Sequence, residues 1–116
     1  MSDTDCLFCK IVAGDIDADI VHQTDHTVAF RDINPQAPTH VLIIPRRHIA
    51  TINALESADA EEIGRLFLAA KDIAAQEGLS EPGYRVTMNC NAGAGQTVFH
   101  VHLHLLGGRQ FGWPPG

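Results

Sequence analysis

Apolar residues occur along this chain in short strand-like runs, with one longer run at helical spacing. The runs at 20–23, 27–31 and 40–44 are rich in Val, Ile and Phe and are bounded by turn residues, which is typical of strands. Residues 84–90 and 99–106 form two further runs that we expect to be the last two strands. The intervening segments are short, and the one at 34–38 contains two prolines, which predict a loop.

The longest regular segment is predicted to be an amphipathic helix at 60–77. Asp59 and Glu62 are predicted to form a capping box at its start, and Gly78 follows its end, where glycine commonly stops a helix. A second, short helical segment is expected at 7–12, after Asp5. One face of the long helix is predicted to be apolar, with these residues at helical spacing: Ile63, Leu66, Phe67, Ala70, Ile73 and Ala74.

Strands joined by short connections, with only one long helix, predict an α+β fold. We expect an antiparallel sheet of about five strands with the long helix on one face and the short helix near the N-terminus. A chain of 116 residues is sufficient for one domain, spanning 1–116, but not for two cores.

Composition narrows the functional classes. The net charge of −6 argues against a surface that coats nucleic acid, which needs many cationic contacts to phosphate. No apolar run approaches the length of a membrane span, and the acidic segment 1–5 is unlike a signal peptide, so we expect neither a membrane nor a nucleic-acid partner. Three cysteines with seven histidines fit a reducing compartment and predict a cytoplasmic protein.

Three histidines at alternate positions are the most distinctive chemical feature. In a regular strand, His100, His102 and His104 would share one face, with neighbours about 6.6 Å apart. This gap suits one phosphate or one metal ion between neighbouring rings. Val101 and Leu103, together with Leu105, would then point into the core. The alternative is a solvated strand face, but titratable rings at near-neutral pH favour a chemical role.

A loop of small and hydrogen-bonding residues precedes these histidines at 91–97. Gly93 and Gly95 allow the backbone to approach a ligand, and successive amide N–H groups can bind an anion. Gln96 and Thr97 add an amide and a hydroxyl group. We interpret the loop as a phosphate-binding element, and the alternative is a plain hairpin connection.

Cys6 and Cys9 form a C-x-x-C pair, which supplies half of a zinc site or a redox pair. A redox motif is expected at the start of a helix beside a parallel sheet, and this arrangement is not predicted. The pair could also be two small buried residues. Zinc would need two more ligands, and the residues by themselves leave several candidates: His22, His26, His40, His48 and the three alternating histidines.

The segment 100–106 resembles the H-φ-H-φ-H-φ-φ signature of the histidine triad (HIT) superfamily, where φ is an apolar residue. Segments 30–40, 44–49 and 107–116 resemble the HINT branch of this superfamily, so the similarity covers most of the chain. The resemblance implies a HIT-like fold with 107–116 as a C-terminal tail. It also implies a homodimeric purine nucleoside phosphoramidase without a catalytic cofactor.

The resemblance also implies catalytic roles. His102 would be the nucleophile that attacks the α-phosphorus, giving a covalent nucleotidyl-histidine that water hydrolyses. His104 would donate a hydrogen bond to the α-phosphate oxygens, and His40 would support the triad. Thr97 stands where the family usually has serine, near the leaving group, and it retains the hydroxyl.

For a purine nucleotide such as AMP or GMP, the resemblance implies a pocket made from several segments. Asp32 would accept hydrogen bonds from the ribose hydroxyls, and Asn89 would bind toward the ribose or phosphate. Trp113 would approach the active site of the partner subunit. The remaining implied contacts are the apolar walls Leu7, Phe8 and Ile33, and the loop residues Gly95, Gln96 and Thr97.

HIT branches that keep both N-terminal cysteines bind zinc, and the matching residues are Cys6, Cys9, His48 and His100. A Cys2His2 set completes a tetrahedron and leaves no position for substrate, so the implied zinc is structural.

Other functions remain open at this level. The nearest are the dinucleotide hydrolases and nucleotidyl transferases of sister branches, although the tail ending in Trp-Pro-Pro-Gly favours the HINT branch. A non-catalytic nucleotide-binding module is a second alternative. A third is a metalloenzyme in which His102 and His104 hold a catalytic ion.

Overall fold

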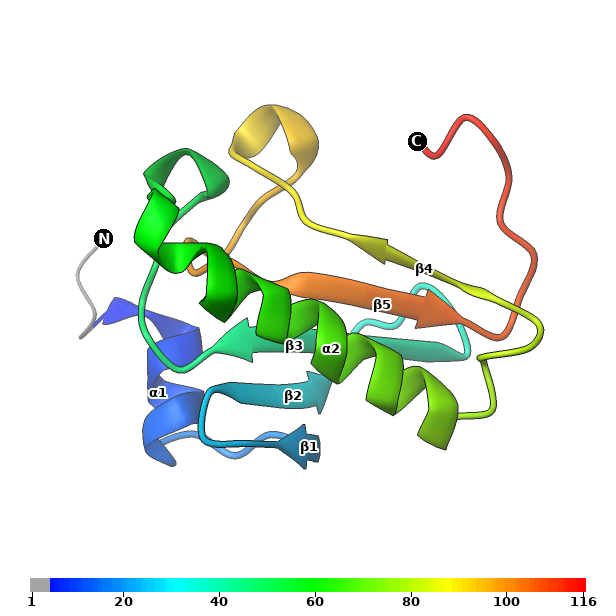
Figure 1. Ribbon diagram of the computed structural model, residues 1–116, viewed down its shortest axis with the longest axis horizontal. Helices are drawn as coiled ribbons and strands as arrows, with labels where there is room; N and C mark the ends of the chain where they lie inside the picture. The colour runs from blue at the N-terminus through cyan, green and yellow to red at the C-terminus, as the bar shows by residue number, and fades with distance from the viewer. Residues whose placement is uncertain (1–4) are drawn as a thin grey trace.

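The computed structural model describes residues 5–116, which form a five-stranded antiparallel sheet with helices on its two faces (Figure 1). The strand order is β1-β2-β3-β5-β4, so β1 and β4 are the two edges. The α+β prediction is therefore confirmed. The elements are α1 Leu7–Ala13, β1 Ile20–Gln23, β2 Thr27–Arg31, β3 Thr39–Pro45, α2 Ala60–Gln76, β4 Tyr84–Thr87 and β5 Leu103–Gly107.

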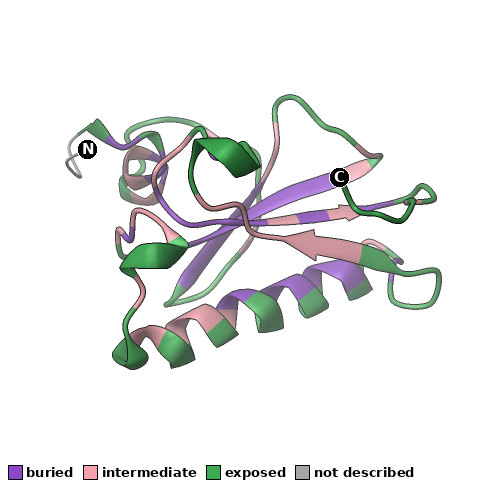
Figure 2. Ribbon diagram, turned by 90° about the horizontal axis from the view of Figure 1, so that it is seen from above, coloured by how far each residue is buried: buried purple, intermediate pink, exposed green. Residues whose placement is uncertain are grey.

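Both faces of the central strands are covered, which explains their nearly continuous apolar sequences. On one face, α2 packs its buried stripe, including Leu66, Ala70 and Ile73, against the sheet (Figure 2). On the other face, Phe8 and Ile11 of α1 pack against a second cluster that contains these strand residues: Val28, Phe30, Leu42 and Ile44. No helix within residues 5–116 is long and apolar enough to cross a membrane.

The start of α2 differs from the prediction. Asp59 makes no side-chain cap to α2 and instead forms a capping box with Glu56 around the preceding 3-10 turn, Ser57–Asp59. Asp59 and Glu62 both bind the guanidinium group of Arg47, which links the helix start to the segment after β3. The predicted Asp59–Glu62 capping box is therefore wrong, because both carboxylates are used in tertiary ion pairs.

The end of α2 is close to the prediction, but its buried face is shifted around the helix. The helix ends at Gln76, one residue early, and Gly78 follows with a φ of +74°, as expected for a helix stop. Phe67 was predicted to face the core, yet its side chain is 52% exposed. Ala69 is buried instead, so the stripe is centred away from Phe67.

The last two strands are shorter than predicted. β4 ends at Thr87, and β5 begins only at Leu103, so His100 and His102 precede the strand. Pairing with β3 begins at Leu103, whereas the backbone N–H of Val101 donates to the carbonyl of Ile49, at 2.7 Å. The prediction of one regular strand through all three histidines is therefore wrong. The apolar alternation still holds, since Val101, Leu103 and Leu105 are all buried.

Candidate active site

A cavity of about 660 Å³ opens beside the sheet on the α1 side. This volume is within the range of small-molecule sites. Its walls come from α1, from the end of β2 and from the segment that leads into β5. They include Leu7, Phe8, Ile11, Phe30, Asp32, Ile33, Leu42, Thr97, Val98, His102 and His104.

His102 lies at the wall of this cavity with its ring orientation set by the backbone. Its Nδ1 lies 2.8 Å from the carbonyl oxygen of His100. Because a carbonyl oxygen can only accept, Nδ1 must carry the proton, and the neutral ring keeps its lone pair on Nε2. Burial lowers the pKa of His102 below its ordinary value, against weaker opposing effects of the His100 hydrogen bond and the Asp32 charge. The ring is therefore neutral, as a nucleophile requires.

Phe8 helps to enclose this ring. Its ring packs edge-on against His102, with centroids 5.1 Å apart and an interplanar angle of 83°. Phe8 is only 4% exposed, so this contact keeps water from one side of the imidazole.

A second chain of hydrogen bonds determines which ring nitrogen of His40 and of His104 carries the proton. The backbone N–H of Gln36 donates to Nδ1 of His40 at 3.0 Å, so His40 carries its proton on Nε2. That N–H faces Nδ1 of His104 at 3.0 Å, with Asp32 Oδ2 at 3.5 Å. His104 therefore accepts at Nδ1 and carries its own proton on Nε2, where it can donate to a ligand.

His40 and His104 are both held in the neutral form. Burial lowers the pKa of His40, partly opposed by Asp32. The pKa of His104 falls to about 4, because of burial first and then the neighbouring rings of His102 and His40. The rings of His102 and His104 lie 4.9 Å apart. The cavity thus has a neutral imidazole acceptor beside a neutral imidazole donor.

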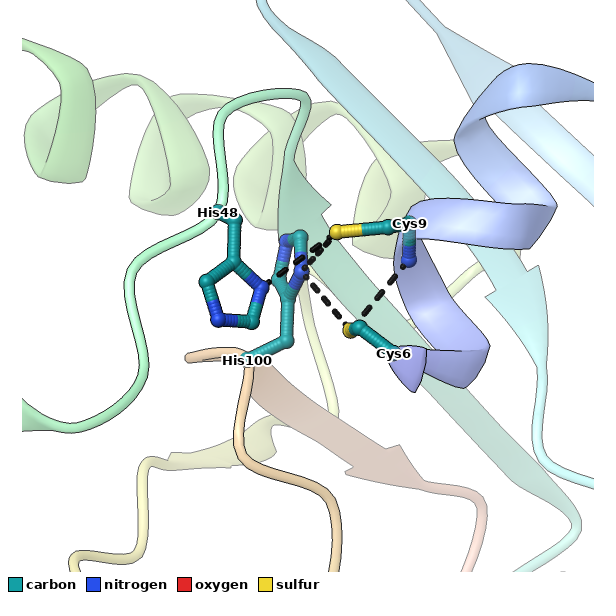
Figure 3. Close-up of side chains that lie close together, drawn as sticks. All are labelled: Cys6, Cys9, His48 and His100. Carbon is teal, nitrogen blue, oxygen red and sulfur yellow. Dashed lines mark hydrogen bonds between the residues drawn. The ribbon is translucent and has the colours of Figure 1, made fainter. Parts of the chain in front are cut away.

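Four potential metal ligands meet on the other side of His100 (Figure 3). Nδ1 of His100 lies 3.4 Å from Sγ of Cys6 and 3.5 Å from Sγ of Cys9, and Nδ1 of His48 lies 3.3 Å from Sγ of Cys9. All four donor atoms lie within 4.8 Å of one another. His100 donates through Nε2 to the carbonyl of Pro45 at 2.9 Å, so its Nδ1 lone pair is directed at the sulfur atoms. Two sulfur and two imidazole donors at this spacing could hold a metal ion.

The alternatives for the C-x-x-C pair are less consistent with this geometry. Cys6 is the N-cap of α1, so the motif does begin a helix, but the neighbouring sheet is antiparallel rather than parallel. His22 and His26 were also candidate ligands, and neither belongs to the four-residue cluster of described residues.

Asp32, His40 and His104 also bring three donor atoms within 4.8 Å. Binding a metal there through Nε2 of His40 would require that ring to move its proton to Nδ1, where the Gln36 N–H already donates. The hydrogen-bond chain thus favours a proton-ordering role for this group over a metal site.

Some of the other predicted nucleotide contacts lie in the cavity wall, and some lie outside it. Leu7, Phe8, Asp32, Ile33 and Thr97 line the cavity. Among the residues that the structure describes, four predicted nucleotide contacts lie outside the lining: Asn89, Gly95, Gln96 and Trp113. The Gln96 amide is turned toward backbone groups, and the Trp113 side chain is 83% exposed. Their roles in nucleotide binding stay predictions.

Sequence reasoning missed several contributors, including the lining residues Ile11, Phe30, Leu42 and Val98. Ile11 lines the cavity, and its spacing of three and four residues from Phe8 and Leu7 could have identified it. The backbone N–H of Gln36, which sets the proton of His40, has no signal in the sequence.

An α+β fold with this histidine arrangement has clear relatives. The family model of the HIT domain matches residues 13–111, and the chain belongs to this family. It is 51% identical over 106 residues to the purine nucleoside phosphoramidase of Escherichia coli strain K12, covering 91% of this chain and 89% of the relative. An uncharacterized HIT-like protein of Synechococcus elongatus is 50% identical over 112 residues, which are 97% of each chain.

Solved structures agree with this assignment. The crystal structure of a HIT family hydrolase from Legionella pneumophila Philadelphia 1 superposes with a TM-score of 0.95 at 57% identity, covering 97% of this chain and all of that one (100%). A histidine triad protein from Clostridium difficile has a TM-score of 0.92 at 34% identity, with 97% of each chain covered.

Proposed function

We propose that this protein is a hydrolase that cleaves the P–N bond of purine nucleoside 5′-monophosphoramidates. The observation that carries the proposal is the hydrogen bond from Nδ1 of His102 to the carbonyl of His100, which leaves the Nε2 lone pair of His102 unprotonated in a ring whose centroid lies 4.9 Å from that of His104. The identity of 51% with the Escherichia coli purine nucleoside phosphoramidase supports the substrate class.

In the first step, Nε2 of His102 forms a bond to the phosphorus while the P–N bond breaks. The leaving nitrogen takes the electron pair of the P–N bond and a proton from solvent and departs as the free amine, and the product is a nucleotide bound to Nε2 of His102 through phosphorus. The imidazole becomes positively charged as it attacks. The carbonyl oxygen of His100, which accepts from the Nδ1–H of His102, stabilises that charge. In the second step, water attacks the phosphorus and loses a proton to solvent, the bond between phosphorus and Nε2 breaks with its electron pair returning to His102, and the nucleoside monophosphate is released.

His104 and Thr97 act on opposite parts of the phosphoramidate. The Nε2–H of His104, fixed by His40, donates to the phosphate oxygens that gain charge in the transition state. The Thr97 hydroxyl lies in the cavity wall and hydrogen-bonds the departing amine.

Asp32 binds the ribose. Its Oδ1 accepts the backbone N–H of Asn34 at 2.9 Å, so the carboxylate is held in place at the cavity and can accept from both ribose hydroxyls. Leu7, Phe8 and Ile33 form apolar walls that suit either purine. Asn89, Gly95 and Trp113 would act at the margin of this pocket, Trp113 through the active site of a partner subunit, whereas Gln96 would act through the loop that precedes Thr97.

The Cys6, Cys9, His48 and His100 cluster would hold a structural zinc ion, which would tie α1 to the segments before β5 and after β3. When bound, zinc would cross-link the chain segments that carry its ligands, and the two thiolates would balance its positive charge. It takes no part in the reaction, which needs no catalytic cofactor. The thiolate ligands also support a reducing, cytoplasmic location.

The protein is a homodimer of single domains spanning 1–116, with 107–116 as a tail. Phe67 and Leu68 on the outer side of α2 are 52% and 59% exposed. β4 is a sheet edge, which a second copy could extend. The exposed apolar side chains of α2 and the unpaired edge of β4 each support association of two copies.

The test is incubation with adenosine 5′-phosphoramidate, followed by mass spectrometry of intact protein. Wild-type protein should carry a transient nucleotide adduct and release ammonia, whereas His102→Ala should do neither. His26→Ala is the matched control, because His26 is exposed and outside the cavity lining. A wild-type protein that cleaves only dinucleotides, or a His102→Ala protein that retains full activity, would contradict the proposal.

A further inference from the structure

Gln96 is a buried polar residue in an otherwise exposed loop. It is 4% exposed, whereas Gly95 before it and Thr97 after it are exposed. Consecutive residues therefore point in opposite directions here, with Gln96 into the protein and Thr97 into the cavity.

The side-chain amide of Gln96 binds three backbone groups. Its Oε1 accepts from the N–H of Asn91 at 2.8 Å, and its Nε2 donates to the carbonyls of Ala50 and Val98 at 2.9 and 3.1 Å. A glutamine amide has only two N–H donors, and both are used. The side chain thus has no donor left for a phosphate oxygen.

These bonds hold the two ends of the loop segment 91–96 together. The backbone N–H of Gln96 also donates to the carbonyl of Asn91, at 3.1 Å, so the two residues are joined in both directions. Asn91 has a φ of +67° and a ψ of 177°, a conformation that L-residues seldom adopt and that persists only where surrounding contacts impose it. The Gln96 bond to the N–H of Asn91 is such a contact.

The same amide connects three segments of the site. Ala50 lies two residues after His48, and Val98 lies two residues before His100. Thr97 is held from both sides along the chain. Gln96 precedes it, and Val98, whose carbonyl accepts from the Gln96 amide, follows it. Movement of the Gln96 amide would therefore displace the Thr97 hydroxyl relative to His102 and His104.

We propose that Gln96 is a positioning residue for P–N cleavage, which holds Thr97 at the leaving-group side of the cavity through backbone hydrogen bonds. This inference rests on the proposed role of Thr97 toward the departing amine. It assigns the side chain of Gln96 to the loop rather than to the nucleotide.

The main test is Gln96→Glu, which keeps the side-chain shape and the acceptor for Asn91 but removes both donors. For an alkylamine phosphoramidate, kcat should fall between about tenfold and a hundredfold, the range expected when a reacting group is displaced by about an ångström. The KM should change much less. The loss should be smaller for an arylamine, which leaves more readily and needs less help from Thr97. Gln76→Glu, at the exposed end of α2, is the matched control and should behave as wild type.

A double-mutant cycle shows whether Gln96 acts through Thr97. If it does, Gln96→Glu should cost little further activity in a Thr97→Ala background, because the hydroxyl that it positions is already absent. Additive losses in the two variants would overturn the inference. So would a raised KM with unchanged kcat, since that result places the amide on the nucleotide.

Amide hydrogen exchange tests the loop without relying on activity. In wild-type protein, the N–H of Asn91 should exchange much more slowly than that of exposed Gly93, and Gln96→Met should remove this protection. Equal exchange at Asn91 and Gly93 in wild-type protein would overturn the inference even if neither variant folds. Inactivity of the wild-type protein toward phosphoramidates would instead contradict the proposed function, and the exchange result would stand separately.

Discussion

The Nδ1–H of His102 donates to the backbone carbonyl of His100, and the side chain of His100 points the opposite way into the Cys6 and Cys9 cluster. One residue therefore belongs to both sites: its carbonyl orients the proposed nucleophile, and its imidazole joins the proposed zinc ligands. The two sites therefore meet at His100, although their chemistry is different.

Loss of the nucleophile should abolish catalysis. His102→Ala should lower kcat by about four orders of magnitude or more, as expected when a covalent nucleophile is removed. Binding of the nucleoside monophosphate product should weaken far less, because Asp32 and the apolar walls remain. Steady-state kinetics and calorimetric titration measure these two effects. Loss of binding and activity together would indicate a disrupted pocket instead.

The Asp32 carboxylate should determine the preference for ribose. Asp32→Asn keeps the size of the side chain but replaces one acceptor oxygen with a donor, so kcat/KM for a ribonucleoside phosphoramidate should fall about tenfold or more. The 2′-deoxy substrate should be affected less, which reduces the preference. Asp25→Asn, on the exposed β1–β2 turn, is the control. An equal loss for both sugars would contradict a direct contact with the 2′-hydroxyl.

Acid should destabilise the protein through His104. Its folded-state pKa of about 4 is below the ordinary value of 6.5, so the unfolded chain binds the proton more tightly. The stability contribution is present above pH 6.5 and is lost as the pH falls toward 4. After allowance for partial exposure of the ring, we expect a loss on the order of 1–2 kcal/mol.

Urea unfolding between pH 4 and pH 7 measures this dependence. His104→Gln should have a shallower decline in unfolding free energy, because the unfolded variant no longer gains that proton. An unchanged pH dependence in His104→Gln would assign the effect to other groups.

Metal removal should destabilise the fold. Purified protein should contain about one zinc ion per chain, and stripping it should lower the unfolding free energy by several kcal/mol, because the metal binds only the folded ligand set. Cys9→Ser should reproduce much of this loss, whereas Cys90→Ser, outside the cluster, should not. Elemental analysis and thermal melting measure both effects. Sub-stoichiometric zinc with both N-terminal thiols titrating readily would contradict the zinc site.

The outer side of α2 should mediate dimer formation. Phe67→Asp or Leu68→Asp places a charge on the exposed apolar surface and should shift the protein toward monomer in sedimentation analysis. Ile20→Asp, on the opposite edge strand, is the control and should leave the association state unchanged. A wild-type protein that is monomeric at micromolar concentration would contradict the proposed homodimer.

Local sequence patterns predicted most of the elements, because apolar periodicity and turn residues act over short distances. β1 and β2 have the predicted bounds, and α2 differs by one residue at its end. The errors occur where a partner distant in sequence intervenes. Arg47 binds Asp59 and Glu62 instead of leaving them to cap the helix, and Ile49 binds the backbone of Val101 before β5 can begin.

The chemical groups that the protein carries can be read from its residues, and the resemblance predicts which of them would form a zinc site and a catalytic triad. The positions of the protons follow from the fold instead. Gln36 and His100 contribute backbone groups, which every residue type has, so their roles in orienting His40 and His102 leave no mark in the sequence. Folding alone places a particular N–H or carbonyl beside a particular ring, and that placement makes one imidazole an acceptor and its neighbour a donor.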